Sequence, residues 1–292
     1  MINRIYVIGQ LNIDYIVPAN TPAEQQASVT SSPLVGGTAF NAAKALKQRN
    51  FESIIIGKVG RDRHGDLIKQ AIRTAGIGFI VKEEAARPTG CCRIVFSDPD
   101  QRCQYYKSSS DDANQFDLDF LKHACDRIDK EDLVFLAGHF LRHCNTSERK
   151  EFIDVLSRKA GPIILDLVPH NIYQDLTLAK FNEIVRDTAS VIIAEFITLW
   201  RLIAPDSLSR APEEADWESL FANYQAEILV VRYGPGNISK QQIRQRAQPG
   251  PPLILEPERD TGFANLNSEE RRGFGDALTA DFLSKFLPVV KL

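Results

Sequence analysis

Residues 272–280 combine flexible glycines, a carboxylate and a helix start. Gly273 and Gly275 flank Phe274, Asp276 follows directly, and apolar residues then continue at helical spacing. Glycines adopt backbone conformations closed to other residues, and a helix N-terminus presents N–H groups that attract anions. Phosphoryl transfer to an alcohol needs donors around the phosphate and a carboxylate near the hydroxyl. The segment offers both, although an ordinary helix capped by an aspartate after a glycine-rich turn would have the same residue pattern.

A second glycine pair, Gly36 and Gly37, also opens a helix-like segment, with Asn41 one turn in. These glycines would let a small polar ligand approach the backbone, and the amide of Asn41 could bond a hydroxyl group. A simple loop-to-helix junction is the alternative interpretation. The pattern therefore indicates a second candidate ligand contact.

The polar residues after the first apolar run form a third candidate. Asn12 and Asp14 are two positions apart, so they share one face of an extended segment. A carboxylate and an amide side by side suit the hydroxyl groups of a sugar, whereas two solvated turn residues would need no ligand. Glycines also follow two later apolar runs, at Gly57-Lys58-Val59-Gly60 and at Gly234-Pro235-Gly236.

The elements that would position these residues alternate between strand and helix. Short, continuous, β-branched runs predict strands buried on both faces, as in a parallel sheet between helices. They lie at residues 5–8, 54–56, 133–136, 163–165, 191–193 and 228–231. Amphipathic segments at 39–49, 64–75, 117–127, 147–158, 178–186 and 213–224 predict the helices. We expect an α/β fold with a doubly wound, mainly parallel sheet, formed by a single domain over residues 1–292.

Two regions interrupt this alternation. Residues 12–18 and 91–107 predict antiparallel β pieces, and the second contains a hairpin with a turn at residues 97–100. We expect them to form a small β-sheet lid, through which two copies of the chain could pair as a homodimer. Residues 203–213 and 245–270 are rich in proline or polar residues and predict loops.

The order and spacing of these segments resemble the ribokinase-like, or phosphofructokinase-B type, carbohydrate kinases. Gly36 to Asn41 resembles the N-terminal signature of that family, and Gly273 to Asp276 resembles its C-terminal signature. The segments at 57–65, 89–107 and 234–236 resemble the parts between them. The resemblance covers essentially the whole chain and implies a ribokinase-like fold with a lid.

The resemblance also implies roles. Asp276 would be the general base, and the amides of Gly273, Phe274, Gly275 and Asp276 would form an anion hole. The substrate, a sugar or nucleoside, would contact Asn12, Asp14, Gly36, Gly37, Asn41 and Lys58. ATP with Mg²⁺ is the implied donor, and its cofactor-binding residues would be Gly234, Gly236, Arg232 and Glu195. Glu195 would contact the metal through water.

Some positions depart from the family pattern. The family commonly has Asn-x-x-Glu where this chain has Glu195-Phe196-Ile197-Thr198, and Arg232 stands where a small hydroxyl residue is usual. Family members usually continue for several tens of residues beyond the helix after Asp276, whereas this sequence ends at Leu292. These departures keep open a second hypothesis, a catalytically impaired protein with a ligand-binding or regulatory role.

Composition and other motifs narrow the function classes. A net charge of −3 provides no basic surface for nucleic acid, and no apolar run is long enough to span a bilayer. Residues 1–5 enter a strand-like run directly, so we expect a cytoplasmic protein without a membrane partner. The five irregularly spaced cysteines argue against a disulfide framework. The spacing after Gly9 does not fit a dinucleotide fingerprint, and residues 234–240 do not fit a P-loop.

Overall fold

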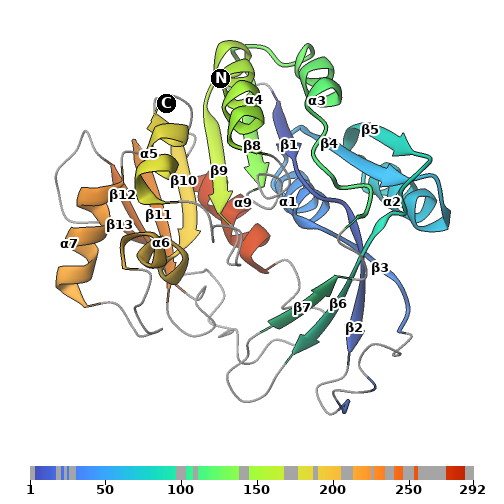
Figure 1. Cartoon of the computed structure of the whole chain (residues 1–292), viewed down its shortest axis with the longest axis horizontal. Coiled ribbons are helices and arrows are strands. Elements are labelled where there is room, and N and C mark those ends of the chain that lie inside the picture. Colours follow the sequence, from blue (N-terminus) through green and yellow to red (C-terminus); the bar gives the residue numbers. More distant parts are fainter. Residues whose placement is uncertain are drawn as a thin grey trace. The chain divides into compact units, whose positions relative to one another are not determined.

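The computed structural model divides the chain into two compact units (Figure 1). The N-terminal unit contains residues 4–117 and 261–291, and the central unit contains residues 118–260. The structure describes residues 4–17, 21–22, 25, 31–96, 103–107, 111–137, 145–167, 177–186, 190–204, 213–224, 227–233, 240–245, 253–255 and 274–286.

The N-terminal unit is built around parallel strands in the order β1-β4-β5. These strands are β1 (Ile5–Ile8), β4 (Ser53–Gly60) and β5 (Gly78–Glu84). The helices of the unit are α1 (Thr38–Lys47), α2 (Arg63–Thr74) and α9 (Phe274–Phe286). Helix α1 packs on β1 and β4, α2 packs on β4 and β5, and α9 packs against α1. Burial of the apolar faces of strands and helices is what stabilises this arrangement.

A small second sheet belongs to the same unit, as predicted for the lid. Its strand order is β3-β2-β6-β7, formed by β3 (Leu34–Gly36), β2 (Asn12–Val17), β6 (Gly90–Phe96) and β7 (Cys103–Lys107). The β6–β7 hairpin is antiparallel, as predicted. The prediction that residues 12–18 are purely antiparallel is wrong in part, because β2 pairs antiparallel with β3 but parallel with β6. The predicted turn at 97–100 lies outside the described residues.

The strands of the central unit are mainly parallel. Its strand order is β13-β12-β11-β10-β9-β8, parallel from β8 to β11 and antiparallel from β11 to β13. The strands are β8 (Leu133–Ala137), β9 (Ile163–Leu167), β10 (Val191–Glu195), β11 (Ile228–Tyr233), β12 (Lys240–Gln245) and β13 (Leu253–Leu255). The helices are α3 (Leu118–Cys125), α4 (Thr146–Lys159), α5 (Leu178–Arg186), α6 (Phe196–Ile203) and α7 (Glu214–Asn223).

The predicted fold class is confirmed: a mainly parallel sheet with flanking helices and a small additional β sheet. Five elements of the described part of the chain escaped prediction: β3, β5, β12, β13 and α6. Strand β5 has few buried side chains, so it lacks the continuous apolar run of its neighbours. Helix α6 follows β10 without any intervening turn residue. Strand β13 lies in the proline-rich stretch 245–270, so the prediction of a loop throughout that stretch is wrong.

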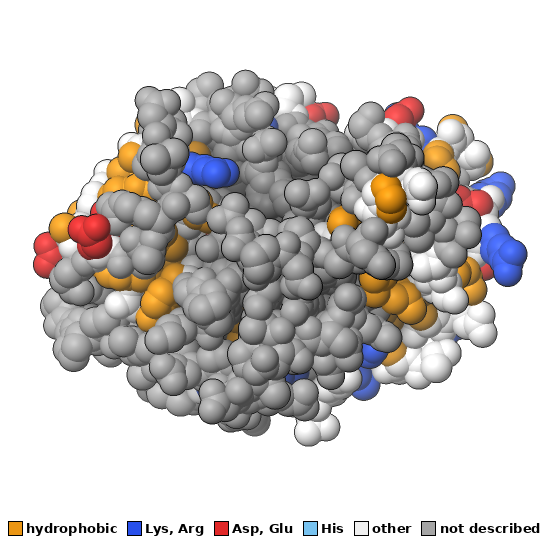
Figure 2. All heavy atoms as spheres, turned by 90° about the horizontal axis from the view of Figure 1, so that it is seen from below, with side chains coloured by type: hydrophobic (Ala, Val, Ile, Leu, Met, Phe, Trp, Pro, Cys, Tyr) orange, Lys and Arg blue, Asp and Glu red, His pale blue; other side chains and the backbone are white. Residues whose placement is uncertain are grey.

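Within the described ranges, no helix is long and apolar enough to cross a membrane. On the face shown in Figure 2, the hydrophobic side chains of the described residues gather in small separate groups. The Lys and Arg side chains of the described residues are scattered over the same face.

Asp62 connects α2 to the small sheet. One carboxylate oxygen, Oδ1, accepts hydrogen bonds from the backbone N–H of Gly65 at 2.8 Å and from the hydroxyl of Thr89 at 2.7 Å. The other, Oδ2, accepts from the backbone N–H of Thr89 at 2.8 Å. Burial alone would raise the pKa of Asp62, but the hydrogen bonds from Thr89 and Gly65 outweigh it and hold the pKa below its usual value. The ionised form is therefore the one that the fold stabilises.

We predict that Asp62→Asn lowers the free energy of unfolding at pH 7 by about 1–3 kcal/mol. The asparagine side chain has only one acceptor oxygen, so its NH₂ group would face one of the N–H groups that the carboxylate of Asp62 now accepts from. Because the pKa of Asp62 is lowered by folding, its contribution is present above the unfolded-state pKa and is lost as the pH falls through the folded-state value. Urea unfolding should therefore show a gap between wild type and variant at pH 7 that narrows below about pH 4.

Asp66→Asn is the matched control, since Asp66 lies in the same first turn of α2 and its side chain is 77% exposed. This variant should stay within about 0.5 kcal/mol of wild type. Equal destabilisation by the two substitutions would show that Asp62 does not link α2 to the sheet.

Candidate functional site

Gly36 and Gly37 lie against the backbone and side chains that follow β1. A Cβ atom at Gly36 would come within 1.8 Å of Oδ2 of Asp14, whose side chain is buried. Gly37 has a φ of +88°, and a Cβ atom there would lie 2.4 Å from the carbonyl oxygen of Gln10. Both positions therefore require glycine, one for the carboxylate of Asp14 and one for the backbone.

Helix α1 begins at this contact without a side-chain cap. Gly37 is its N-cap residue, so no side chain is available to bond the N–H groups of the first turn. The N–H of Ala39 donates to the carbonyl of Gln10 at 3.3 Å, which holds the helix start against the β1–β2 connection. Asn41 lies one turn in and is half-buried. The sequence-predicted residues Asp14, Gly36, Gly37 and Asn41 therefore come from neighbouring parts of one unit.

Asn12 belongs to a buried amide cluster that sequence reasoning missed. The side-chain N–H of Asn114 donates to Oδ1 of Asn12 at 2.9 Å, and Oδ1 of Asn114 accepts from the backbone N–H of Leu11 at 3.0 Å. Gly90 lies against both amides, since a Cβ atom there would lie 2.3 Å from Oδ1 of Asn12. The only sequence signal for Asn114 is a polar run at 111–114 before a helix. This cluster fixes the orientation of Asn12.

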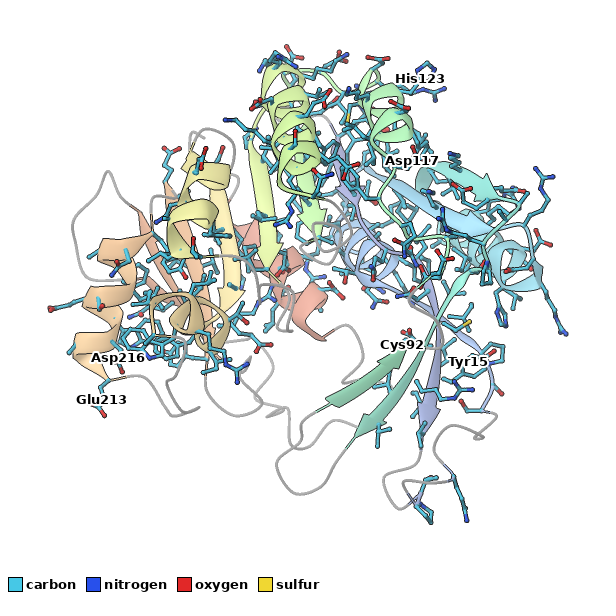
Figure 3. The ribbon with its side chains drawn as sticks, in the orientation of Figure 1. Tyr15, Cys92, Asp117, His123, Glu213 and Asp216 are labelled. Carbon is cyan, nitrogen blue, oxygen red and sulfur yellow. The ribbon has the colours of Figure 1, made fainter. Side chains whose placement is uncertain are left out.

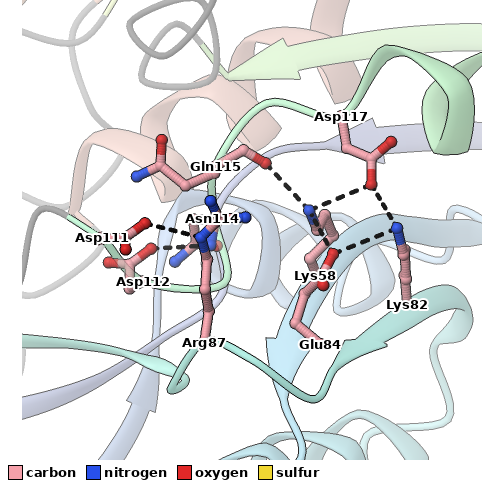
Figure 4. A network of polar contacts seen from close by, with 9 residues as sticks. All are labelled: Lys58, Lys82, Glu84, Arg87, Asp111, Asp112, Asn114, Gln115 and Asp117. Carbon is pink, nitrogen blue, oxygen red and sulfur yellow. Dashed lines mark hydrogen bonds and ion pairs between the residues drawn. The ribbon is translucent and has the colours of Figure 1, made fainter.

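Lys58 lies in an ion-pair network rather than alone (Figure 4). Its buried ammonium is 2.7 Å from Oε1 of Glu84 and 3.4 Å from Oδ2 of Asp117, and it donates to the carbonyl of Gln115 at 3.3 Å. Hydrogen bonding to Lys58 lowers the pKa of Glu84, although burial opposes this effect. Through residues 115–117 the network supports Asn114, so these partners favour a positioning role for Lys58. Direct contact with a substrate stays a prediction.

Asp276 lies in the first turn of α9 and is half-buried. The helix is held by the burial of Leu278 and Phe282. It is also held by an ion pair in which the guanidinium of Arg49, just after α1, binds the carboxylate of Asp281. Asp276 therefore sits at the start of a helix packed on α1, and α1 begins at Gly37. Gly273 lies outside the described residues, and Phe274 and Gly275 are the first residues of α9.

The central unit brings together three charged residues at the carboxyl ends of neighbouring parallel strands. Glu195 of β10 is directly opposite Arg232 of β11, and Asp166 of β9 is opposite Ile193 of β10. The guanidinium of Arg232 donates to Oδ2 of Asp166 at 3.2 Å, and both side chains are buried. Burial raises the pKa of Glu195 to about 8; Arg232 opposes this shift and Asp166 adds to it. Gly234 and Gly236 lie outside the described residues.

The structure therefore contains two groups of candidate residues. The N-terminal unit holds the residues suited to bind hydroxyl groups, together with Asp276. The central unit holds Glu195 and Arg232, which the sequence predicted, and Asp166, whose part in the cluster depends on strand register. Within the described ranges, no three His, Cys, Asp or Glu side chains are grouped as a metal site.

The known sequences that this chain resembles are carbohydrate kinases. The profile described as "pfkB family carbohydrate kinase" matches residues 3–196. A 5-dehydro-2-deoxygluconokinase from Listeria monocytogenes serotype 4a (strain HCC23) is 26% identical over 239 residues, which are 79% of this chain and 70% of the relative. A ribokinase from Bacillus subtilis (strain 168) is 26% identical over 137 residues, 46% of each chain.

Solved structures share the fold. An adenosine kinase from Sinorhizobium meliloti has a TM-score of 0.74 at 13% identity, covering 99% of this chain and 88% of its own. A fructokinase with bound ATP from Xylella fastidiosa has a TM-score of 0.72 at 12% identity, covering 100% of this chain and 83% of its own. At these identities the likeness concerns the fold alone.

The charged cluster of the central unit leads to a stability prediction. We expect Arg232→Met to lower the free energy of unfolding by about 3–5 kcal/mol, because it leaves the buried carboxylate of Asp166 without its cation. The double variant Asp166→Leu, Arg232→Met should recover a large part of this loss, because it removes both buried charges. Urea denaturation measures both values.

Arg61→Met is the control, because the side chain of Arg61 is 70% exposed and its carboxylate partner lies 3.8 Å away. Its effect should stay below about 1 kcal/mol. If Arg232→Met proved as mild as Arg61→Met, the buried pair would not hold the ends of β9 and β11 together.

Proposed function

Because this chain belongs to the pfkB family of carbohydrate kinases, we propose that Asp276 takes the proton from a sugar hydroxyl that attacks the γ-phosphate of ATP. One observation carries this proposal. Asp276 lies in the first turn of α9, which packs on α1, and α1 begins where Gly36 and Gly37 meet the buried carboxylate of Asp14. A carboxylate that could act as base and a hydroxyl-binding group thus belong to the same compact unit.

The acceptor would be held by side chains that the fold has already oriented. Asp14 is confined by Gly36, and Asn12 is fixed by its bond to Asn114. Such rigid acceptors and donors select the orientation of a polyhydroxylated ligand, because each unsatisfied buried polar group would cost about 1–3 kcal/mol. Gly37 would allow close approach, and Asn41 would supply a further amide.

The phosphate would be stabilised by backbone N–H groups at the start of α9. The first N–H groups of a helix have no partner inside the helix, and the helix dipole favours negative charge there. We propose that the amides of residues 273–276 bind the transferred phosphate as charge develops on it. Asp276 would bind the acceptor hydroxyl at the same helix end, so proton removal and phosphate binding are coupled by position.

The charged cluster of the central unit fits the ATP and Mg²⁺ that such a reaction uses. Mg²⁺ prefers carboxylate oxygens and keeps several of its waters, and Asp166 and Glu195 place two carboxylates beside one guanidinium. We propose that Glu195 contacts the metal through water and that Arg232, Gly234 and Gly236 contribute to nucleotide binding. Bound Mg²⁺ would neutralise charge on the phosphates of ATP.

The relatives suggest where to begin the search for the acceptor. Their names include a 5-dehydro-2-deoxygluconokinase and a ribokinase, and the structural neighbours include a fructokinase and an adenosine kinase. We propose a sugar or sugar-containing small molecule, and a panel should contain a keto-sugar acid, pentoses, hexoses and a nucleoside.

Asp276→Asn tests the role of the base. We predict that it lowers kcat for the best acceptor of the panel by about 10²–10⁴-fold, since an amide cannot accept the hydroxyl proton. Coupled detection of ADP measures the rate in the presence of Mg²⁺ and ATP. Asp281→Asn is the matched control, because it makes the same change later in α9, where the carboxylate binds Arg49.

The control should keep kcat within about threefold of wild type, because Asp281 is held in an ion pair away from the start of the helix. Equal rates for wild type and Asp276→Asn would remove Asp276 from the reaction. Thermal shifts induced by an acceptor or by ATP, without any turnover by the wild type, would favour the alternative of a binding or regulatory protein.

Gly36→Ala tests the acceptor site. The added methyl group would displace the carboxylate of Asp14, so we predict that KM for the acceptor rises about tenfold or more while KM for ATP changes little. Gly78→Ala is the control, because it adds the same group at the start of β5, where the nearest atom is Cγ1 of Ile54 at 3.1 Å. A rise in both KM values, or none in either, would contradict the assignment of Asp14.

A further inference from the structure

Tyr15, His64 and Cys91 form a continuous polar contact outside the sites described above. The hydroxyl of Tyr15 lies 3.0 Å from Nε2 of His64, and Nδ1 of the same ring lies 3.3 Å from Sγ of Cys91. The three residues come from β2, the first turn of α2 and β6. All three are partly exposed, so a small molecule in solvent can reach the cluster.

Both ring nitrogens of His64 therefore have a polar partner. With the ring proton on Nε2, the ring donates to the hydroxyl oxygen of Tyr15, and Nδ1 accepts from the thiol of Cys91. Burial raises the pKa of Tyr15, as does Cys91, so the phenol keeps its proton at neutral pH and can orient the ring. An imidazole held in this way can accept the thiol proton and then stabilise the thiolate that remains.

Charged groups surround the cluster, and among them the carboxylate of Asp62 interacts with His64. Arg93 and Arg63 act on Tyr15 electrostatically in the direction that favours negative charge. Cationic surroundings and a histidine partner are the features that lower the pKa of reactive cysteines. Cys125 has the opposite environment: it is buried, and burial raises the pKa of its thiol to about 12. Cys92 is also buried.

The cluster lies on the opposite face of the small sheet from Asn12 and Asp14. Cys91 is in register with Ile13, and side chains alternate between the faces of a strand. Cys91 and Tyr15 therefore share the face that contacts α2, whereas Cys92 is in register with Asp14 on the other face. Figure 3 shows Tyr15 on β2 and Cys92 on the neighbouring β6.

We propose that Cys91 is a nucleophilic thiol, activated by His64 and oriented through Tyr15, and that it is a site of reversible oxidation by hydroperoxides. The sulfur of Cys91 attacks one peroxide oxygen, the O–O bond breaks and an S–O bond forms. The thiol proton passes to the leaving oxygen through His64, so that Cys–SH and ROOH give Cys–SOH and ROH. Sulfur loses two electrons, and the peroxide gains them.

Oxidation of Cys91 would affect the strand that carries the acceptor-binding residues; this consequence rests on the proposed function. The added oxygen must fit between β6 and α2, and the oxidised sulfur no longer offers a thiolate to His64. Because Ile13 lies between Asn12 and Asp14 on β2, a shift at Cys91 displaces both. We expect weaker acceptor binding without direct contact between Cys91 and the acceptor.

Thiol labelling tests the proposal without relying on enzyme activity. The full chain is treated briefly with iodoacetamide at neutral pH, and the extent of labelling at each cysteine is read by peptide mass spectrometry. We expect Cys91 to react at least about tenfold faster than Cys92 and Cys125. His64→Gln should reduce this rate about tenfold, and Tyr15→Phe should reduce it less.

Hydrogen peroxide followed by dimedone, which traps sulfenic acids, should label Cys91 in the wild type and much less in His64→Gln. The circular dichroism and melting temperature of each variant show that it folds. Slow labelling of Cys91, or the same rate in wild type and His64→Gln, would overturn the proposal. Reducing agent should reverse the oxidation.

Enzyme kinetics test the expected effect of Cys91 oxidation on acceptor binding. Peroxide should raise KM for the acceptor about fivefold or more in the wild type, and Cys91→Ser should be resistant while keeping its untreated activity. An inactive wild type whose Cys91 is still labelled rapidly would refute the proposed function and leave the thiol assignment standing. Equal sensitivity of wild type and Cys91→Ser would refute the regulatory consequence.

Discussion

The close approach of the Gly36–Gly37 pair to the chain that follows β1 is the constraint on which the N-terminal unit depends. At Gly36 the space of a side chain is taken by the carboxylate of Asp14, and at Gly37 it is taken by the backbone of Gln10. Any side chain there would move β2, the start of α1, or both. The same absence of side chains leaves the first turn of α1 without a cap. One packing requirement thus sets the carboxylate, the open helix end and the orientation of the small sheet together.

Elements buried on both faces could be predicted from the sequence, because burial leaves a continuous apolar run such as 228–231 or 163–165. Elements that lack a continuous apolar run could not be predicted. Strand β5 has few buried side chains, and α6 begins directly after Glu195 with no turn residue to announce it. Strand pairing was harder to predict. Strand β2 runs parallel to β6, which lies far along the chain, and a local sequence pattern carries no information about such a distant partner.

The same distinction between local and distant signals applies to the residues of the candidate site. Glycine pairs followed by a helix, and the spacing of Asn12 and Asp14, are local signals, so these residues could be named in advance. Asn114 could not, because it acts on a backbone group 103 residues away, and its own neighbours are simply polar. Lys58 shows the converse limit of local patterns. Its type suggested a ligand contact, but closure of the fold brings Glu84 and other protein oxygens to its ammonium. Residue type thus indicates chemistry, whereas distant partners decide whether that chemistry is available to a ligand.

The two polar clusters also differ in what their burial costs. The amides of Asn12 and Asn114 satisfy each other and the backbone of Leu11, so their burial leaves no net charge and the cluster can be rigid. In the central unit, the guanidinium of Arg232 pairs with Asp166 and also acts electrostatically on Glu195, and burial opposes the ionised form of Glu195. Burying that excess of negative charge costs free energy that only a cation or a proton can offset. A rigid amide pair suits the recognition of hydroxyl groups, while a cluster with excess negative charge suits a ligand that brings a cation with it. The amide pair therefore fits the acceptor, and the charged cluster fits the nucleotide with its metal, as we propose.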